Sequence, residues 1–588
     1  MSSIDALTAA AADQGRKKPA LPYSADWLVY CAIIVCTALK ALVGNVGHSA
    51  DAVAYLDLSD AIRDHRWHAL VNGYWFPGYP ALLALGRAVF GFSTRHEFMA
   101  ARFVTMLAFF LFVVACLTLG ESVRRLMLYR GIPESDLLPR RVLCLWVTGF
   151  SYFCGQDFMG ITPDALVSAF MVLTVACLVW TRAGGGVIAY VCVGVFAAFA
   201  FWTKTFAFSF FVLLIFFSVI MDLPRFRTSR RLAVSVLVFG IIAGPYIWAL
   251  SASKGRLTFG DTGRLNFAWF WNGADRFNPV EDPSMCYRGT ARISFKHPGD
   301  LLAKSPEIAY FGGDVVQGSM PQWDDPSYWW DGTSPRVNIY RIVRVMMSSM
   351  ATMFNLLIMR FQGVLFVVLL YFGGFALRKR SWVDAVLPAS LFTAGACIGL
   401  YALVLVEGRY IAFSVAMAGI LIAGVALARE KGEPNPLLNL ALFLMVAVIL
   451  TDGAQTSLRE WKAAKSAGAQ PLSGIYDDMP QLSAGTDLAH RFSPGTEVAC
   501  MGDKACWADP SWARHAGVRI TAVIETGNGW NTASAETGCV KLERNLSALN
   551  PLRERNVRAI VARFDADHGC SSEWIPIGKS RDFFYRPL

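Results

Sequence analysis

Apolar stretches of about 20 residues, separated by polar connections, recur along most of the chain. A helix needs about this length to cross the hydrocarbon core of a bilayer. The pattern predicts a polytopic α-helical membrane protein with eleven membrane helices, over residues 27–45, 98–120, 142–156, 163–181, 186–203, 205–222, 232–251, 345–376, 383–405, 410–428 and 437–454.

A further apolar stretch at 76–92 opens with Phe76-Pro77-Gly78-Tyr79-Pro80 and is shorter than the others. Its length does not predict a crossing and equally fits a juxtamembrane or re-entrant helix. If it crosses together with another short helix, the count rises toward thirteen and the orientation of the chain stays the same.

Basic residues gather in alternate connections between the predicted helices, and such clusters are typical of cytoplasmic loops. A cytoplasmic N-terminal tail, 1–26, and an eleven-helix count place every cluster inside: Arg124, Arg125, Arg130, Arg140 and Arg141; Arg225, Arg227, Arg230 and Arg231; Arg378, Lys379 and Arg380; Arg429 and Lys431. The loops 46–97 and 252–344 of the membrane domain (27–455) then face outward, as does the tail (456–588). We expect a multi-pass protein of the bacterial inner (plasma) membrane.

Composition agrees with a membrane protein. The 588 residues are 55% hydrophobic and only 17% charged, whereas soluble domains carry about 25% charged residues. A net charge of +10 can indicate nucleic-acid binding, but here the basic residues lie where membrane topology places them. We therefore expect the lipid bilayer, and no nucleic acid, as a partner.

The tail has a different pattern from the membrane domain. Short β-rich runs at Glu497 to Met501, Val518 to Ile524 and Val557 to Phe564 alternate with helical or polar stretches. This alternation predicts a small α/β domain. Because it shows neither a glycine-rich phosphate loop nor a nucleophile elbow, a lid or scaffold without chemistry is the favoured role.

The tail also holds four cysteines: Cys500, Cys506, Cys539 and Cys570. An even number in one exported segment permits two disulfides. A zinc site is the alternative, but no C-x-x-C pair is present, so disulfides are favoured. The histidines are scattered without an H-x-x-x-H pair, and the sequence therefore assigns no metal ligands.

An acidic residue, Asp51, lies six positions past the first predicted helix, at its outward end. A carboxylate at a membrane boundary is costly unless it has a partner or a function. If the segment is helical, Asp51 and Tyr55 share one face, with Leu58 and Ile62 continuing it, as in an amphipathic interfacial helix. Asp51 is a candidate general base; capping of that helix is the alternative role.

Several motifs on the outward side follow in order: Asp51-x-x-x-Tyr55-Leu56, the aromatic–proline segment around Trp75, Arg102 at a helix start, Thr162-Pro163-Asp164, Trp202-Thr203-Lys204 and Glu407-Gly408-Arg409-Tyr410. Together they resemble the GT-C superfamily, membrane glycosyltransferases that use polyprenyl-phosphate sugars, which includes protein O-mannosyltransferases and aminoarabinose transferases. The chain departs from the family pattern in having Ala50 before Asp51 and Thr205 after Lys204.

The resemblance implies an enzyme, a hexosyl- or pentosyltransferase of the inverting type. Its donor would be a polyprenyl-phosphate-linked sugar and its acceptor an extracytoplasmic glycan, lipid or protein, with a divalent cation left open as a cofactor. It implies Asp51 as the base and Lys204, Arg409 and Arg102 as donor-phosphate ligands. For substrate contacts it suggests Tyr55, Trp75, Asp164, Glu407 and Tyr410.

A group of aromatic and acidic residues in the second exported loop, led by Trp323, fits either sugar binding or an interfacial aromatic belt. Two other functions remain open. A flippase or transporter of lipid-linked sugars would show internal repeats and ionisable residues near mid-membrane. A polysaccharide polymerase or ligase would place its key Arg and His residues in a long late loop.

Overall fold

The computed structural model describes residues 30–36, 49–94, 96–155, 158, 160–222, 226–274, 276, 279–280, 294–313, 315–356, 384–426, 436–466, 479–526, 534–564, 570 and 572–588. The predicted tail 1–26, most of the first predicted helix, much of the helix predicted at 345–376, and the basic residues Arg225, Arg378, Lys379, Arg380, Arg429 and Lys431 lie outside these ranges.

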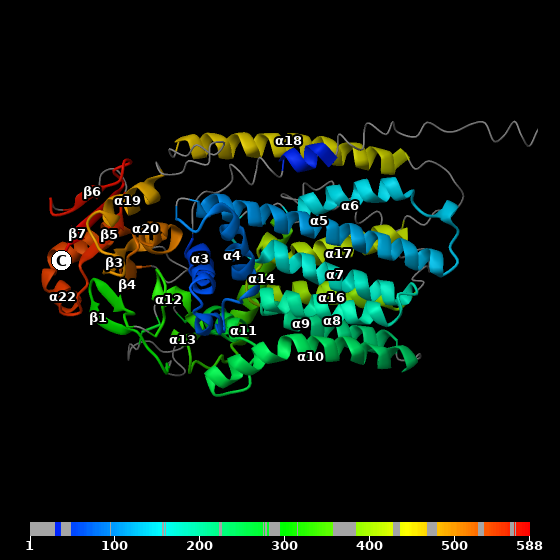
Figure 1. The fold of residues 1–588 in the computed structure, drawn as a ribbon, viewed down its shortest axis with the longest axis horizontal. Helices are drawn as coiled ribbons and strands as arrows, with labels where there is room; N and C mark the ends of the chain where they lie inside the picture. The colour runs from blue at the N-terminus through cyan, green and yellow to red at the C-terminus, as the bar shows by residue number, and fades with distance from the viewer. Residues whose placement is uncertain are drawn as a thin grey trace, which may run out of the picture.

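Long helices run side by side along the long axis of the molecule and form a bundle (Figure 1). They are α5 (Glu97–Tyr129), α6 (Arg140–Cys154), α7 (Asp164–Arg182), α8 (Gly186–Thr203), α9 (Phe206–Met221), α10 (Phe226–Lys254), α16 (Val386–Ala402), α17 (Gly408–Ala426) and α18 (Pro436–Ser466). Within the described residues, five helical segments are long and apolar enough to span a membrane: Glu97–Tyr129, Asp164–Arg182, Gly186–Thr203, Arg231–Lys254 and Gly408–Val425. A multi-pass membrane fold is therefore confirmed.

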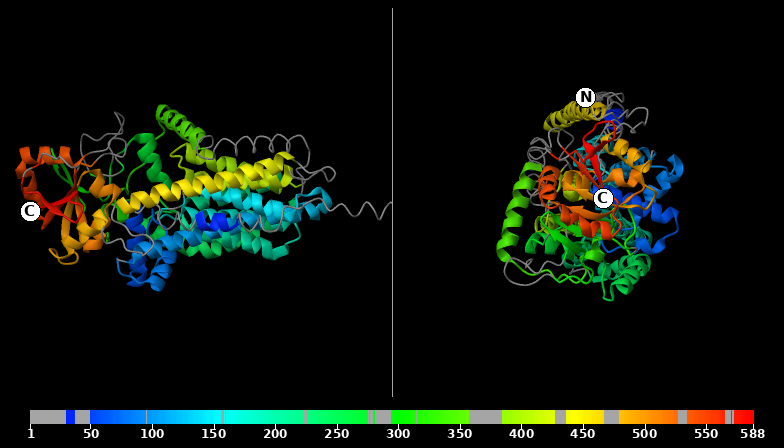
Figure 2. Two further views of the ribbon diagram at one scale, coloured as in Figure 1. Left: turned by 90° about the horizontal axis from the view of Figure 1, so that it is seen from above. Right: turned by 90° about the vertical axis from the view of Figure 1, so that its left-hand side faces the viewer.

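Shorter helices lie at one end of the bundle, next to the C-terminal domain (Figures 1 and 2). They are α3 (Ala50–Arg63), α4 (Gly78–Phe90), α11 (Thr262–Asn272), α12 (Pro321–Asp324) and α13 (Pro326–Trp329). Helix α14 (Ile339–Asn355), of 17 residues, contacts α11 and α16. The 13 residues of α4 extend only about 20 Å, less than the roughly 30 Å of a hydrocarbon core. Its length matches the juxtamembrane or re-entrant alternative.

The sequence predicts that α3 lies as an amphipathic helix at the membrane interface, whereas in the structure protein encloses most of the helix. Nine of its 14 residues are buried, and they pack against α4, α12 and the C-terminal domain. The helix carrying Asp51 is thus enclosed by protein on several sides, which fixes its position more firmly than an interface would.

The C-terminal domain is built around a seven-stranded mixed sheet with the order β1-β2-β4-β3-β5-β7-β6. The strands are β1 (Asp300–Lys304), β2 (Glu307–Tyr310), β3 (Glu497–Met501), β4 (Arg519–Ile524), β5 (Ala559–Arg563), β6 (Ile575–Ile577) and β7 (Phe583–Pro587). Strands β4, β3 and β5 are parallel, and the other pairs are antiparallel. The three predicted strand regions are confirmed.

Two features of the sheet domain differ from the predicted tail domain. Strands β1 and β2 come from the loop 252–344, and Ile308 of β2 pairs with Ile524 of β4. Helix α18 continues from Pro436 to Ser466 through the predicted boundary at 455/456. The strands β1 and β2 of the loop 252–344 therefore belong to the same sheet as the strands of the tail.

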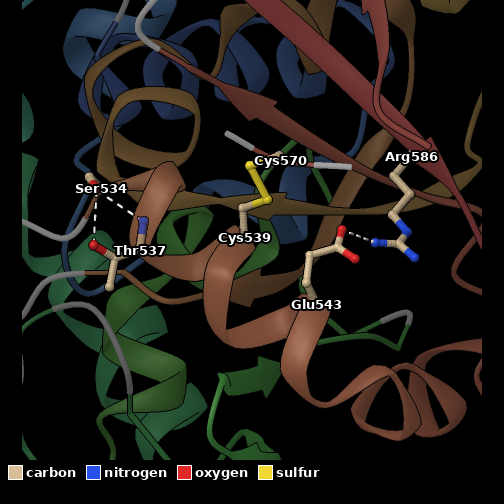
Figure 3. The surroundings of a disulfide bond; sticks show 6 residues. All are labelled: Ser534, Thr537, Cys539, Glu543, Cys570 and Arg586. Carbon is tan, nitrogen blue, oxygen red and sulfur yellow. Dashed lines mark hydrogen bonds and ion pairs between the residues drawn. A yellow bond between two sulfur atoms is a disulfide. The ribbon is translucent and has the colours of Figure 1, made fainter. Parts of the chain in front are cut away.

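Helices cover the sheet: α19 (Pro480–Ala489), the short turn η7 (Lys504–Ala508), α20 (Ser511–Ala516), α21 (Ala535–Arg544) and α22 (Asn550–Glu554). The predicted disulfides are present, joining Cys500 to Cys506 and Cys539 to Cys570. Figure 3 shows the second one, which ties α21 to the segment before β6. The Ser534 hydroxyl accepts a hydrogen bond from the Thr537 N–H and caps α21.

A buried arginine joins the C-terminal domain to the membrane domain. The Arg514 guanidinium, on α20 and 5% exposed, pairs with Asp57, with Asp60 at 2.5 Å and with Glu97 at 2.9 Å. Burial alone would lower its pKa, but Glu97, Asp57 and Asp60 raise the pKa of Arg514 well above its usual value. Arg87 also approaches Asp60, at 2.9 Å. The charge network holds α3 against the C-terminal domain.

Replacing Arg514 with methionine should destabilise the protein by about 3 to 5 kcal/mol, because buried carboxylates lose their main partner. The thermal unfolding midpoint of the full-length protein in lipid nanodiscs measures the loss. Arg555→Met is the matched control: Arg555 pairs with the largely exposed Asp300, so a change below about 1 kcal/mol is expected. Equal effects of the two substitutions would contradict a special role for Arg514.

Candidate functional site

A cavity of about 450 Å³ lies where the ends of the bundle helices meet α3, α11 and the aromatic–proline segment. Its walls come from α3, the starts of α7 and α17, the turn between α8 and α9, α11 and the end of α16. Seven residues proposed from sequence line it: Asp51, Tyr55, Trp75, Asp164, Lys204, Arg409 and Tyr410. Positions far apart in the chain therefore converge on one space.

Asp51 lies in the first turn of α3, after Ser49 as the N-cap residue. The start of a helix favours a negative charge. Asp51 is not itself the cap; its Oδ1 accepts a 2.9 Å hydrogen bond from the indole Nε1–H of Trp323. The carboxylate is thus oriented by a tertiary contact, while it also lines the cavity.

Asp164, the first residue of α7, pairs with two cations of the cavity. Its side chain is 3% exposed. The Lys204 ammonium approaches one of its carboxylate oxygens at 2.6 Å, and the Arg409 guanidinium approaches the other at 3.6 Å. Lys204 follows α8 in an extended conformation, which turns its side chain away from the helix. One carboxylate holds both cations, whose side chains remain 21% and 22% exposed.

Arg409 has two further partners at the start of α17. Its Nε donates to Glu407 at 2.6 Å, and its Nη2 donates to the Tyr410 hydroxyl at 3.2 Å. The ring of Tyr410 also lies 4.2 Å from the Lys204 Nζ, within the range of a cation–π contact. Glu407, Arg409 and Tyr410 thus act as one unit that presents cationic groups to the cavity.

Asn72 holds Tyr74 and Trp75, two aromatic residues of the cavity lining, by hydrogen bonds. Its side-chain oxygen accepts bonds from the backbone N–H groups of Tyr74 and Trp75, and its amide donates to the Asp324 carbonyl. The Trp75 indole donates to the Trp323 carbonyl at 2.8 Å. These bonds fix the aromatic–proline segment against the second exported loop.

Tyr55 is buried against Trp75, with ring centroids 4.9 Å apart. Burial raises the pKa of its hydroxyl well above the usual value, and the carboxylates of Asp164 and Asp51 raise it further. Tyr55 therefore stays protonated at physiological pH and offers the cavity a hydrogen-bond donor between two carboxylates.

Of the described residues proposed from sequence, Arg102, Glu407 and Trp323 are not part of the cavity lining. Arg102 is buried within α5. Glu407 reaches the site through Arg409. Trp323 is 2% exposed, so its ring face offers no surface for sugar stacking here; it contacts the site through its bond to Asp51.

The lining includes further residues that the sequence analysis did not propose, among them Tyr74, Arg264, Arg276 and Tyr401. Arg264 and Arg276 belong to the loop 252–344, in which only the aromatic and acidic group led by Trp323 was proposed as a binding element. The sequence holds no signal that separates these two arginines from the other basic residues of the loop, such as Lys254, Arg256 and Lys296. Of the described lining residues, four are cationic and two acidic.

Thr205, at which the chain departs from the family pattern, packs closely against Gly260. Gly260 faces it with φ +136, a conformation that favours glycine, and a Cβ on Gly260 would lie 2.7 Å from the Thr205 methyl group. The Thr205 and Thr262 hydroxyls are 3.2 Å apart. The α8–α9 turn therefore packs directly against the loop that begins α11.

Metal ligands were not predicted, and a divalent cation was left open. Among the described residues, no group of three or more His, Cys, Asp or Glu side chains is arranged to hold a metal ion.

Neither a known protein-family profile nor a curated protein sequence matches the chain. Among solved structures, the chain is similar to ArnT from Cupriavidus metallidurans. ArnT bound to undecaprenyl phosphate gives a TM-score of 0.50 at 12% identity, covering 96% of this chain and 98% of ArnT. The apo state gives 0.50 at 13% identity with the same coverage. The chain therefore has the fold of ArnT along nearly its whole length.

Removing the Asp164 carboxylate should leave Lys204 and Arg409 able to bind an anion between them. Asp164→Ala should lower the thermal unfolding midpoint, and sulfate should restore more of it than chloride at equal ionic strength, because sulfate can bridge Lys204 and Arg409. Asp222→Ala is the matched control: Asp222 pairs with Arg182 at the opposite end of α9. Restoration by sulfate in both variants, or in neither, would argue against an anion site.

Proposed function

We propose that this protein is a membrane glycosyltransferase that moves a sugar from a polyprenyl-phosphate donor to an extracytoplasmic glycan, lipid or protein. The observation that carries the proposal is the convergence of Asp51, Lys204 and Arg409 on one cavity at the end of a membrane helix bundle. The ArnT-like fold, and the undecaprenyl phosphate that ArnT binds, support the class of donor. The sugar would be a hexose or a pentose.

Asp51 is the proposed general base. Its Oδ1 is engaged by the Trp323 indole, and we assign Oδ2 to take the proton of the acceptor hydroxyl or amine. The acceptor atom then attacks the anomeric carbon, and the bond from that carbon to the phosphate oxygen breaks. A single displacement of this kind inverts the anomeric configuration, and the polyprenyl phosphate leaves with the bonding electrons.

Lys204 and Arg409 are the proposed ligands of the donor phosphate. Negative charge grows on the phosphate as the sugar leaves, and fixed cations in a partly enclosed site stabilise that charge. The Asp164 carboxylate holds both in place before the donor binds. Arg264 and Arg276 also line the cavity, and Arg264 pairs with Asp331 at 3.4 Å. Tyr55, Trp75 and Tyr410, which line the same cavity, are the proposed sugar contacts.

The position of the cavity favours transfer over transport. A transporter site is expected near the middle of the membrane, between repeated helical units. Here the candidate residues lie at the ends of α7, α8 and α17, beside the sheet domain. A polyprenyl phosphate can keep its tail in the lipid and present its sugar at that level. With the basic loops inside, this end faces away from the cytoplasm.

A polymerase or ligase is the second candidate, and one observation favours it. Arg264 and Arg276 of the long loop 252–344 line the cavity, as such an enzyme would require. It shares the lipid-linked donor with the first proposal, and the two differ in whether Asp51 is essential.

Asp51→Asn should abolish transfer, with a loss of at least 100-fold in kcat, because an amide cannot accept the proton. Binding of radiolabelled undecaprenyl phosphate should stay within about twofold. The assay uses the full-length protein in nanodiscs, a panel of polyprenyl-phosphate hexoses and pentoses, and envelope extract from a deletion strain as the acceptor source. The control is Asp64→Asn, in the exposed Asp64–Arg63 pair. Wild-type turnover by Asp51→Asn would remove the proposed base and favour the ligase.

Lys204→Gln should weaken the binding of undecaprenyl phosphate by about 10- to 100-fold, because a charge-assisted contact to the phosphate is lost. Equilibrium binding of the radiolabelled lipid in nanodiscs measures the effect. Lys541→Gln, which removes an ion pair to Glu525 in the C-terminal domain, is the matched control. Unchanged affinity of the Lys204 variant would exclude its assigned role.

A further inference from the structure

We infer that the C-terminal domain completes the active site: Trp507, held by the Cys500–Cys506 disulfide, positions Trp323 and thereby orients the Asp51 carboxylate. This inference rests on the proposed role of Asp51 as the general base. It assigns a positioning function to a domain that the sequence suggested was a lid or scaffold.

The first link is the bond from the Trp323 indole to Asp51. The Nε1–H of Trp323 donates to Oδ1 over 2.9 Å, and hydrogen bonds to an ionised acceptor are among the stronger ones. The indole is 2% exposed, so water does not compete freely for the contact. The orientation of the carboxylate therefore follows the orientation of the Trp323 ring.

The second link is the packing that sets the Trp323 ring. Trp75 and Trp269 lie on the membrane-domain side, with centroids 6.0 Å and 6.1 Å away. Trp507 approaches from the C-terminal domain, edge to face at 5.4 Å and 80°. Aromatic pairs prefer such geometry and stabilise each other beyond simple burial. Trp507 thus closes one side of the pocket that holds the Trp323 ring.

The third link is the turn that carries Trp507. The turn η7 (Lys504–Ala508) follows β3, and the disulfide joins its Cys506 to Cys500 within that strand. On the other side, the Trp512 indole donates to the Ala505 carbonyl at 3.0 Å. Because the turn is fastened to the sheet and to α20, Trp507 has little freedom to move away from Trp323.

A fourth observation distinguishes the positioning of the Asp51 carboxylate from the docking of helix α3. Arg514 on α20 forms ion pairs with Asp57 and Asp60, which lie on the same helix as Asp51. The C-terminal domain therefore acts on α3 at two places: directly, by charge near the middle of the helix, and near its start through Trp323, against which Trp507 packs. Loosening η7 leaves the charge contact in place, so α3 stays docked while the carboxylate loses its fixed orientation.

The consequence for catalysis is a loss of kcat rather than of donor binding. A proton acceptor must lie within hydrogen-bond reach of the proton that it removes, and a misplacement of about 1 Å can cost about 100-fold in rate. The phosphate ligands Lys204 and Arg409 are held by Asp164, which belongs to the helix bundle. We therefore expect changes in the C-terminal domain to leave the affinity for the donor unchanged.

The two disulfides of this domain provide a matched test. In the full-length protein in nanodiscs, Cys500→Ser with Cys506→Ser should lower kcat at least tenfold, while the affinity for undecaprenyl phosphate changes less than twofold. Cys539→Ser with Cys570→Ser removes the disulfide of Figure 3, which lies at α21; it should lower the unfolding midpoint and leave kcat unchanged. Equal kcat in the two double variants would overturn the inference.

Point substitutions test the aromatic contact without touching a disulfide. Trp507→Ala should lower kcat at least tenfold, and Trp507→Phe, which keeps an aromatic edge, should recover most of it. In a Trp323→Phe background, which lacks the indole N–H, Trp507→Ala should have little further effect on kcat. Additive losses would show that Trp507 acts through overall stability and would overturn the proposed chain of contacts.

Failure of the inference is distinguishable from failure of the proposed function. Absence of sugar transfer by the wild-type protein from every donor of the panel would count against the transferase. An active wild-type protein whose kcat is unchanged by Trp507→Ala would refute only the positioning role. Loss of undecaprenyl phosphate binding in the Cys500/Cys506 variant would also refute it, because the phosphate ligands are predicted to be independent of this turn.

Discussion

A single buried carboxylate determines how the candidate site is assembled. Asp164 begins α7 and pairs with Lys204, from the turn after α8, and with Arg409, at the start of α17. Charges removed from water are costly unless paired, so the three helix ends are confined to positions in which the carboxylate serves both cations. The cations remain partly exposed on the cavity side. The bundle thus holds them in place and leaves them available to a ligand.

The environment of Asp51 is built from parts of the chain that are remote in sequence. Trp323 and the strands β1 and β2 come from the loop 252–344, and Trp507 and Arg514 come from the tail. The loop joins the tail through the pairing of β2 with β4. A carboxylate near the start of the chain therefore depends on a domain that is completed only near its end.

Local patterns were sufficient to predict much of this architecture. Membrane helices are marked by their own apolar residues, so α7 and α8 were placed within about a residue of their bounds. Strand β3 was also predicted at its observed bounds. The residues 300–310 were not predicted as strands, because these short strands take their partners from the tail. Likewise, α18 extends past its apolar part, which hydropathy could not show.

The candidate site was predictable where residue type and side of the membrane suffice. Asp51, Lys204 and Arg409 could be proposed as one group because the predicted topology puts all three on the same side of the membrane. The contribution of Arg276 and the burial of Trp323 could not be proposed, since both depend on which loop packs against which. A tryptophan ring looks the same in sequence whether it stacks on a sugar or, as here, fixes a carboxylate.

The ionic network around Arg514 and the one around Asp164 differ in how far their cations are exposed, and therefore in the roles open to them. At Arg514, the carboxylates of Asp57, Asp60 and Glu97 surround a guanidinium that is 5% exposed, so that cation is saturated and can only serve structure. At the cavity, Lys204 and Arg409 pair with Asp164 but keep side chains that are 21% and 22% exposed. A cation that is held in place and partly exposed can pair with an anion that enters the cavity. The same residue types thus brace the fold in one place and, under the proposed function, are available to a phosphate in the other.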